Sequence, residues 1–217
     1  MTDFSNLTAL NEETYQRGIT ELCTKDSELA GVVLKWGRPP FWTHTPGFPG
    51  IVIAILAQQV SLESAKATFT KLENEIGSIS PEGFLSLNND ILRAIGFSRQ
   101  KASYARGIAK EILISNFDFT KLNSLDDDAI RNNLMEFKGI GPWTADTYLL
   151  FSLRRPDVWP TGDLALEKAI QDLRTLSSKP GSEEANRIAN YWRPWRAVAA
   201  RILWHYYLCE RGRHVAA

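Results

Sequence analysis

The fold of this chain is decided by Leu134-Met135-Glu136-Phe137-Lys138-Gly139-Ile140-Gly141-Pro142-Trp143-Thr144-Ala145. Before Lys138, residues 126–136 have the composition of a helix whose acidic first turn suits the positive end of the helix dipole. Pro142 suits the first position of a second helix, which we expect to run to about residue 154. Glycine tolerates positive φ and has no Cβ, so Gly139 and Gly141 allow a tight turn. The stretch therefore predicts a helix, a glycine hairpin and a second helix.

The start of the second helix is a predicted anion site. The first N–H groups of a helix have no partner within it, and together with the helix dipole they attract a phosphate group. The candidate phosphate-binding residues of the hairpin are Lys138, Gly139, Gly141 and Thr144. The alternative is a plain helical corner packed in a core, because a Gly-x-Gly pattern alone does not require a ligand.

A carboxylate follows the hairpin in the segment Trp159-Pro160-Thr161-Gly162-Asp163-Leu164. Asp163 stands where a further helix should begin, and we expect that helix to end at Leu173. One interpretation is that Asp163 serves as an N-cap and has no further role, which is the simpler one for the residue taken alone. The helix dipole also favours its ionised form, so Asp163 is a candidate for a chemical role as well.

The hairpin Lys-Gly-Ile-Gly-Pro-Trp-Thr-Ala and the Pro-x-x-Asp segment together resemble the helix-hairpin-helix DNA glycosylases. The resemblance is strongest to the AlkA-like 3-methyladenine DNA glycosylase II family of alkylation repair, and it continues weakly from about residue 48 to residue 208. It implies that Asp163 is the essential aspartate. It also implies a DNA glycosylase that flips an alkylated purine out of double-stranded DNA and hydrolyses its N-glycosidic bond in base-excision repair.

Trp143 bears on the reaction type. Bifunctional relatives have a lysine at this position, which forms a Schiff base with the sugar and leads to strand cleavage. Tryptophan cannot do this, so we expect a monofunctional enzyme that leaves an abasic site and has no lyase activity. A non-catalytic DNA-binding or damage-sensing module and a glycosylase for deaminated or mismatched bases are the alternatives.

Aromatic side chains are the candidates for a base pocket. A purine alkylated at N3 or N7 is cationic and gains roughly 0.5–2 kcal/mol on an aromatic face. Its weakened glycosidic bond needs no general acid from the protein. The predicted pocket residues are Trp143, Trp159, Phe41 and Trp42. For each of them the alternative is a role in the hydrophobic core.

Two further segments are predicted to touch DNA. Gln58-Gln59-Val60-Ser61 ends an apolar helix over residues 51–57 and resembles a family signature that approaches the DNA backbone and the lesion; the alternative is a helix cap. Ser98-Arg99-Gln100-Lys101 begins a helix to about residue 114. In the family, the loop before this helix fills the gap left by the extruded base, which by position falls on Ser98 or Arg99. The alternative is a solvated basic helix face that includes Lys101.

Composition limits the remaining possibilities. The chain has 217 residues, 44% of them hydrophobic, and a formal net charge of zero, so the basic residues of a DNA-binding protein must gather on one face. Cys23 and Cys209 have no metal-ligand spacing, which argues against a disulfide framework, a zinc site and a four-cysteine iron–sulfur cluster. We expect no cofactor, apart from a structural Na⁺ or K⁺ that the resemblance implies on main-chain carbonyls near Gly139 and Gly141.

The predicted architecture is all-α, with about nine or ten helices in two lobes around a central cleft for DNA and the base. One lobe is expected over residues 45–120, and the other over residues 1–44 and 121–217, including the hairpin at 126–154. Helical spacing is expected over residues 12–30 and a loop over residues 36–50. We expect an intracellular monomer without a signal peptide or membrane span, in a bacterial or archaeal cytoplasm or a eukaryotic nucleus.

Overall fold

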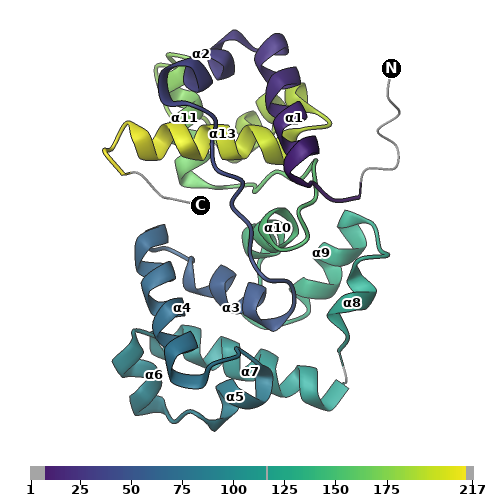
Figure 1. Cartoon of the computed structure of the whole chain (residues 1–217), viewed down its shortest axis with the longest axis vertical. Helices are drawn as coiled ribbons and strands as arrows, with labels where there is room; N and C mark the ends of the chain where they lie inside the picture. The colour runs from purple at the N-terminus through teal and green to yellow at the C-terminus, as the bar shows by residue number, and fades with distance from the viewer. Residues whose placement is uncertain (1–7, 116, 214–217) are drawn as a thin grey trace. The chain divides into compact units, whose positions relative to one another are not determined.

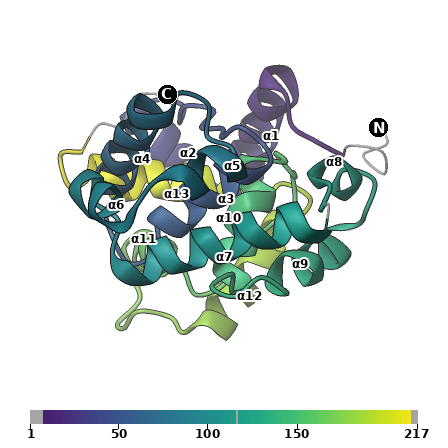
Figure 2. The ribbon, with the colours of Figure 1, turned by 90° about the horizontal axis from the view of Figure 1, so that it is seen from below.

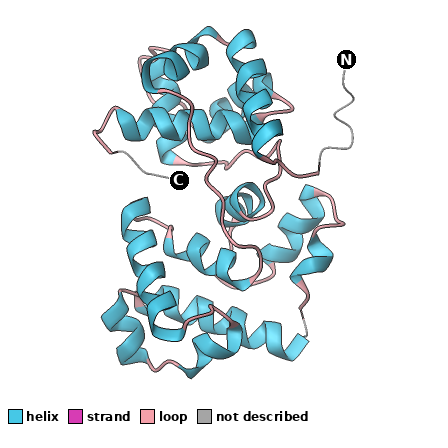
Figure 3. Cartoon of the chain, viewed as in Figure 1, coloured by secondary structure: helices cyan, strands magenta, loops and turns pink. Residues whose placement is uncertain are grey.

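A computed structural model describes residues 8–115 and 117–213, and every regular element within those ranges is a helix, as the all-α prediction requires (Figures 1 and 3). The chain divides into two compact units. Unit 1 comprises the described parts of Met1–Thr43 and Arg154–Ala217, and unit 2 is His44–Leu153. Among the described helices, none is both long enough and apolar enough to cross a membrane.

Unit 2 is built around a helix that is buried on all sides, α3 (Phe48–Leu56). It packs on α4, α7 and α10. Gly50 makes the contact with α10 possible, because a Cβ there would overlap the hydroxyl of Ser152 and touch the ring of Tyr148. The other helices of the unit are α4 (Leu62–Ile76), α5 (Pro81–Ser86), α6 (Asn89–Ile95), α7 (Arg99–Ser115), α8 (Phe119–Leu122), α9 (Asp127–Met135) and α10 (Pro142–Phe151) (Figure 2).

The division of the chain differs from the predicted lobes. Residues 121–153, which hold the hairpin, belong with residues 44–120 rather than with the two ends of the chain. The reason is the packing of α10 on α3, where the Tyr148 hydroxyl accepts a hydrogen bond of 2.9 Å from the Gly47 amide. This contact depends on residues far apart in sequence, so no local pattern reveals it.

Unit 1 is organised around α13 (Arg196–Cys209), which packs on α1, α2 and α11. Arg201 lies at its centre with no exposed surface, and its guanidinium donates to the carbonyls of Ala197 and Trp42 at 3.1 Å each. Burial lowers the pKa of Arg201 to about 10. The other elements are α1 (Glu12–Lys25), α2 (Ser27–Trp36), α11 (Leu164–Leu173), α12 (Ser182–Ala189) and the 3₁₀ turn Asn190–Trp192.

The helical stretch predicted over residues 12–30 is present but divided, because Asp26 separates α1 from α2. Its buried carboxylate caps α2, accepting from the amides of Glu28 and Leu29 at 3.0 and 3.2 Å. The same carboxylate accepts from the Trp192 indole at 2.8 Å and from Arg174 at 2.5 Å. A buried charge survives only with such partners, so the break in the helix is tied to the packing of unit 1.

Candidate active site

The glycine hairpin between α9 and α10 is as tight as predicted, but its two glycines differ. Gly139 has φ of 97°, and a Cβ there would overlap the ring of Tyr104 on α7. Gly141 has φ of −100° with nothing within 4 Å of a Cβ position. The turn therefore requires glycine at Gly139, whereas Gly141 has an ordinary backbone with open space beside it. As the N-cap of α10, Gly141 offers no side-chain hydrogen bond to the first N–H groups of the helix.

The end of α3 braces the hairpin through Gln58. The Gln58 side-chain amide donates to the Gly139 carbonyl at 2.9 Å and to the Thr144 hydroxyl at 3.0 Å. Thr144 is only 3% exposed, so both side chains face the protein. The structure thus gives Gln58 and Thr144, which were predicted to contact DNA, a supporting position behind the hairpin surface. A carbonyl oxygen has two acceptor sites, so the Gly139 oxygen keeps room for a cation or a second donor.

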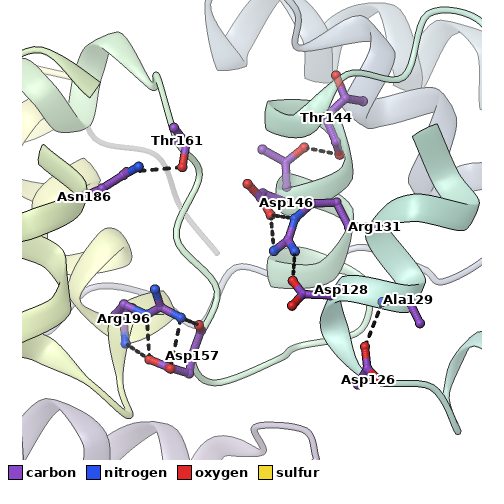
Figure 4. A network of polar contacts seen from close by, with 11 residues as sticks. Asp126, Asp128, Ala129, Arg131, Thr144, Asp146, Asp157, Thr161, Asn186 and Arg196 are labelled. Carbon is purple, nitrogen blue, oxygen red and sulfur yellow. Dashed lines mark hydrogen bonds and ion pairs between the residues drawn. The ribbon is translucent and has the colours of Figure 1, made fainter. Parts of the chain in front are cut away.

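Beneath the hairpin, an ion pair joins α9 to α10 (Figure 4). Asp146 is 3% exposed and accepts from Arg131 at 2.8 Å, and Arg131 also reaches Asp128 at 2.5 Å. A buried carboxylate paired in this way holds the two helices in register. Sequence reasoning missed the pair, because Asp146 carries no local signal that points to Arg131.

Lys101 was predicted to contact DNA, but its side chain is bound within unit 2. Its ammonium donates to the Leu56 carbonyl at 2.7 Å, at the C-terminal end of α3, where a cation is favoured by the helix dipole. Partial burial lowers the pKa of Lys101. Lys101 is thus a brace within unit 2, whereas Arg99 and Lys138 are exposed.

Ser61 and Ser98 act as helix caps. The Ser61 hydroxyl accepts from the Ser64 amide, and the Ser98 hydroxyl accepts from the Lys101 amide, each at 3.2 Å. Both residues remain exposed, so this role leaves their predicted contact with DNA open.

Gln59 has an unusual backbone. It is exposed and has φ of 57°, a conformation that costs a non-glycine residue about 1 kcal/mol or more. It lies between the braced Gln58 and the cap residue Ser61. Strained backbone of this kind clusters at functional sites, so it supports Gln59 as a candidate contact residue.

In unit 1, Asp163 is the N-cap of α11 and is 8% exposed. Its Oδ1 atom accepts from the amides of Ala165 and Leu166 at 3.0 and 2.9 Å. The turn before it is closed by a bond of 3.3 Å from the Asp163 amide to the Pro160 carbonyl, with Gly162 at φ of 80°. These fixed donors at the start of α11 hold the carboxylate in one orientation.

Trp204 is a site residue that the sequence did not reveal. Its indole N–H donates to Oδ1 of Asp163 at 3.2 Å from α13. The ring is 8% exposed, so it forms one wall around the aspartate. The two residues are far apart in sequence and share no spacing motif, which is why pattern reasoning passed over Trp204.

The predicted pocket aromatics lie in different settings. Trp159 is 6% exposed and packs against Trp192 with ring centroids 5.7 Å apart, and Phe41 stacks on Tyr15 at 4.6 Å. These contacts fit the core alternative for Trp159, whereas Phe41 is only half-buried, so its stacking on Tyr15 leaves its predicted pocket role open. Trp42 and Trp143 are half-buried, as a residue that offers a ring face must be.

Comparison with known proteins identifies relatives over most of the chain. A sequence model of the HhH-GPD superfamily of base excision DNA repair proteins matches residues 52–194. The chain is 31% identical over 210 residues to DNA-3-methyladenine glycosylase 1 of Schizosaccharomyces pombe, covering 90% of this chain and 92% of that protein. It is 25% identical over 201 residues to the alkylbase DNA glycosidase-like protein mag2 of the same yeast, with 89% and 94% covered.

Solved structures give the same picture. The structure of the Schizosaccharomyces pombe 3-methyladenine DNA glycosylase in complex with abasic DNA superposes with a TM-score of 0.77. The sequences are 25% identical, and the match covers 88% of this chain and 95% of the yeast chain.

Proposed function

Because this chain belongs to the HhH-GPD superfamily of base excision DNA repair proteins, we propose that it is a monofunctional DNA glycosylase that removes alkylated purines from double-stranded DNA. The names of its relatives, which are 3-methyladenine DNA glycosylases, support this substrate class. The observation that carries the proposal is the Asp163 carboxylate, held by two amides and the Trp204 indole at the start of α11.

The chemistry follows from the charge that develops during the reaction. As the bond from C1′ to the base breaks, the deoxyribose becomes positively charged. A fixed carboxylate stabilises that charge and orients the attacking water, and it needs no reorganisation because its donors already hold it. Asp163 is the residue that we assign to this step.

DNA binding is assigned to the hairpin of unit 2. The N-terminus of α10 has no side-chain cap and directs main-chain N–H groups toward a phosphate, and exposed Lys138 adds a positive charge beside it. Extruding a base costs a few kcal/mol, which such phosphate contacts must offset. The Gln58 and Tyr104 contacts at Gly139 keep the turn rigid for this purpose.

The reaction type and lesion are assigned through Trp143. It occupies the position from which a lysine would attack the sugar, so hydrolysis without strand cleavage is expected. Half-buried at the first turn of α10, its ring is suited to stack on a cationic base such as 3-methyladenine or 7-methylguanine.

A panel of duplex oligonucleotides tests the proposal. Duplexes carrying 3-methyladenine, 7-methylguanine, hypoxanthine or uracil should show base release only for the alkylated purines, and borohydride should trap no covalent complex. Release of the deaminated bases alone would favour the second glycosylase class. A borohydride-trapped adduct would contradict the monofunctional mechanism.

We further propose that the enzyme acts as a monomer and that a Na⁺ or K⁺ ion sits on main-chain carbonyls of the hairpin. The acceptor capacity left on the Gly139 oxygen supports the ion site. Replacing KCl by tetramethylammonium chloride at equal ionic strength should weaken DNA binding, and unchanged affinity would remove the ion from the proposal.

A further inference from the structure

A second carboxylate lies one helical turn beyond Asp163 on α11. Glu167 is 4% exposed, and its amide bonds to the Asp163 carbonyl at 2.9 Å, so both side chains lie on one face of the helix. A charged group so deeply buried requires partners. Glu167 has two: the Ser182 hydroxyl donates to Oε1 at 3.0 Å, and the Lys179 ammonium pairs with Oε2.

The partners of Glu167 come from the segment that leads into α12. Ser182 is the first residue of α12, and Lys179 lies in the loop before it. The Ser182 hydroxyl would be 3.6 Å from a Cβ built on Gly162. One turn further along α12, Asn186 accepts a hydrogen bond of 3.2 Å from the Thr161 hydroxyl (Figure 4). The first two turns of α12 therefore lie beside the two residues that precede Asp163, with a hydrogen bond to Thr161.

From this arrangement we infer that Glu167 is a positioning residue for Asp163, a role that rests on the proposed function. Through Ser182 and Lys179, Glu167 fastens the start of α12 to α11. Because α12 is fixed in this way, it also fixes the bend formed by Thr161 and Gly162, so the Asp163 carboxylate keeps its orientation. Lys179 also neutralises Glu167, so Glu167 adds no net negative charge beside Asp163.

Loss of the Glu167 contacts should affect catalysis strongly and DNA binding weakly. A displacement of a reacting group by about 1 Å can cost on the order of 100-fold in rate. Loosening the Asp163 turn should therefore slow the chemical step, while the DNA contacts of the hairpin in unit 2 are unaffected. Replacing a residue that served only the stability of unit 1 would not lower the rate of the chemical step while leaving DNA binding unchanged.

The test uses three variants. They are Glu167→Ala, the milder Ser182→Ala, and the double variant Glu167→Gln/Lys179→Met, called the neutral pair because it replaces the ion pair by uncharged side chains. The control is Asp172→Asn, which removes the surface ion pair with Lys168 on the same helix. Single-turnover excision from methylated DNA should fall roughly 10–100-fold in Glu167→Ala with DNA affinity within about twofold. Ser182→Ala should show a smaller fall of the same kind. The neutral pair keeps an acceptor for Ser182 and should recover most of the rate.

A second readout needs no activity. The Trp204 indole N–H resonance, assigned with Trp204→Phe, reports the bond to Asp163 and should shift in Glu167→Ala and Ser182→Ala but not in Asp172→Asn. An unmoved resonance together with a wild-type rate in Ser182→Ala would overturn the inference, even if Glu167→Ala fails to fold. If the resonance shifts in Glu167→Ala and Ser182→Ala but the wild-type protein excises no base, the link from Glu167 to Asp163 stands and the proposed function is refuted.

Discussion

The Trp204 indole N–H donates a hydrogen bond of 3.2 Å to Oδ1 of Asp163 and thereby joins the centre of α13 to the N-terminus of α11. The same oxygen accepts from the first amides of α11, so its direction is set by two helices at once. A carboxylate with this many fixed donors is prepared for charge stabilisation before substrate arrives.

Trp204→Phe should slow excision. The variant keeps most of the apolar wall but loses a hydrogen bond to a charged group, which is worth about 1.5–3 kcal/mol, or roughly 10–100-fold in rate. Single-turnover kinetics on methylated DNA measure the effect. Trp36→Phe is the control, because it also loses an indole bond to a carboxylate, that of Glu210 at 3.3 Å, but in an exposed position. Equal rates in the two variants would show that the Asp163 bond is dispensable.

Gly139 and Gly141 should respond differently to alanine. At Gly139 the positive φ and the overlap with Tyr104 predict a loss of about 1–3 kcal/mol in stability together with weaker DNA binding. At Gly141 the backbone is ordinary and the space is open, so the protein should remain as stable as the wild type. Urea unfolding of both variants checks this, and a larger loss in Gly141→Ala would contradict the hairpin geometry.

The side chain that fills the gap left by the extruded base can be identified by comparing Gln59→Ala with Arg99→Ala. Both positions are exposed, but only Gln59 has a strained backbone conformation. We expect Gln59→Ala to reduce base extrusion, measured by 2-aminopurine fluorescence. Arg99→Ala should mainly lower the salt dependence of binding, by about one unit of slope. Loss of extrusion in Arg99→Ala alone would restore the assignment made from sequence.

Stability should fall at alkaline pH because of Tyr148. Burial raises the pKa of this phenol from 10.0 to about 12, despite the bond that its oxygen accepts from the Gly47 amide. An unfolded tyrosine loses its proton near pH 10, so between pH 10 and 12 the unfolded state binds fewer protons and folding weakens as pH rises. By pH 11 the loss is about 1.4 kcal/mol. Tyr148→Phe should be less stable at pH 8 but decline less from pH 9 to 11 in urea titrations; an unchanged decline would contradict this origin.

The sequence predicted the features that depend on neighbours along the chain. The hairpin, the helix that begins at Ser98-Arg99 and the helix that starts after Asp163 are each set by a few adjacent residues, and the structure contains all of them. Boundaries were less accurate: α10 ends at Phe151 instead of about residue 154, since Arg154 takes φ of 58°.

Features that depend on distant contacts were not predictable from pattern alone. Lys101 and Gln58 were predicted to contact DNA, yet their polar side-chain atoms donate hydrogen bonds to the Leu56 and Gly139 carbonyls within unit 2. The partnership of Trp204 with Asp163 joins segments with no common spacing. Likewise, Asp26 ends α1 because its partners Trp192 and Arg174 come from the far end of unit 1.

The most direct test of the central claim is the single-turnover excision rate of Asp163→Asn on DNA containing an alkylated purine. Asparagine is an equally good N-cap, so α11 and the fold should be preserved, as thermal unfolding can verify. We predict that DNA affinity is retained while excision falls by at least about 100-fold, because a neutral amide cannot balance the charge on the sugar. Excision at the wild-type rate by this folded variant would show that Asp163 is only a helix cap.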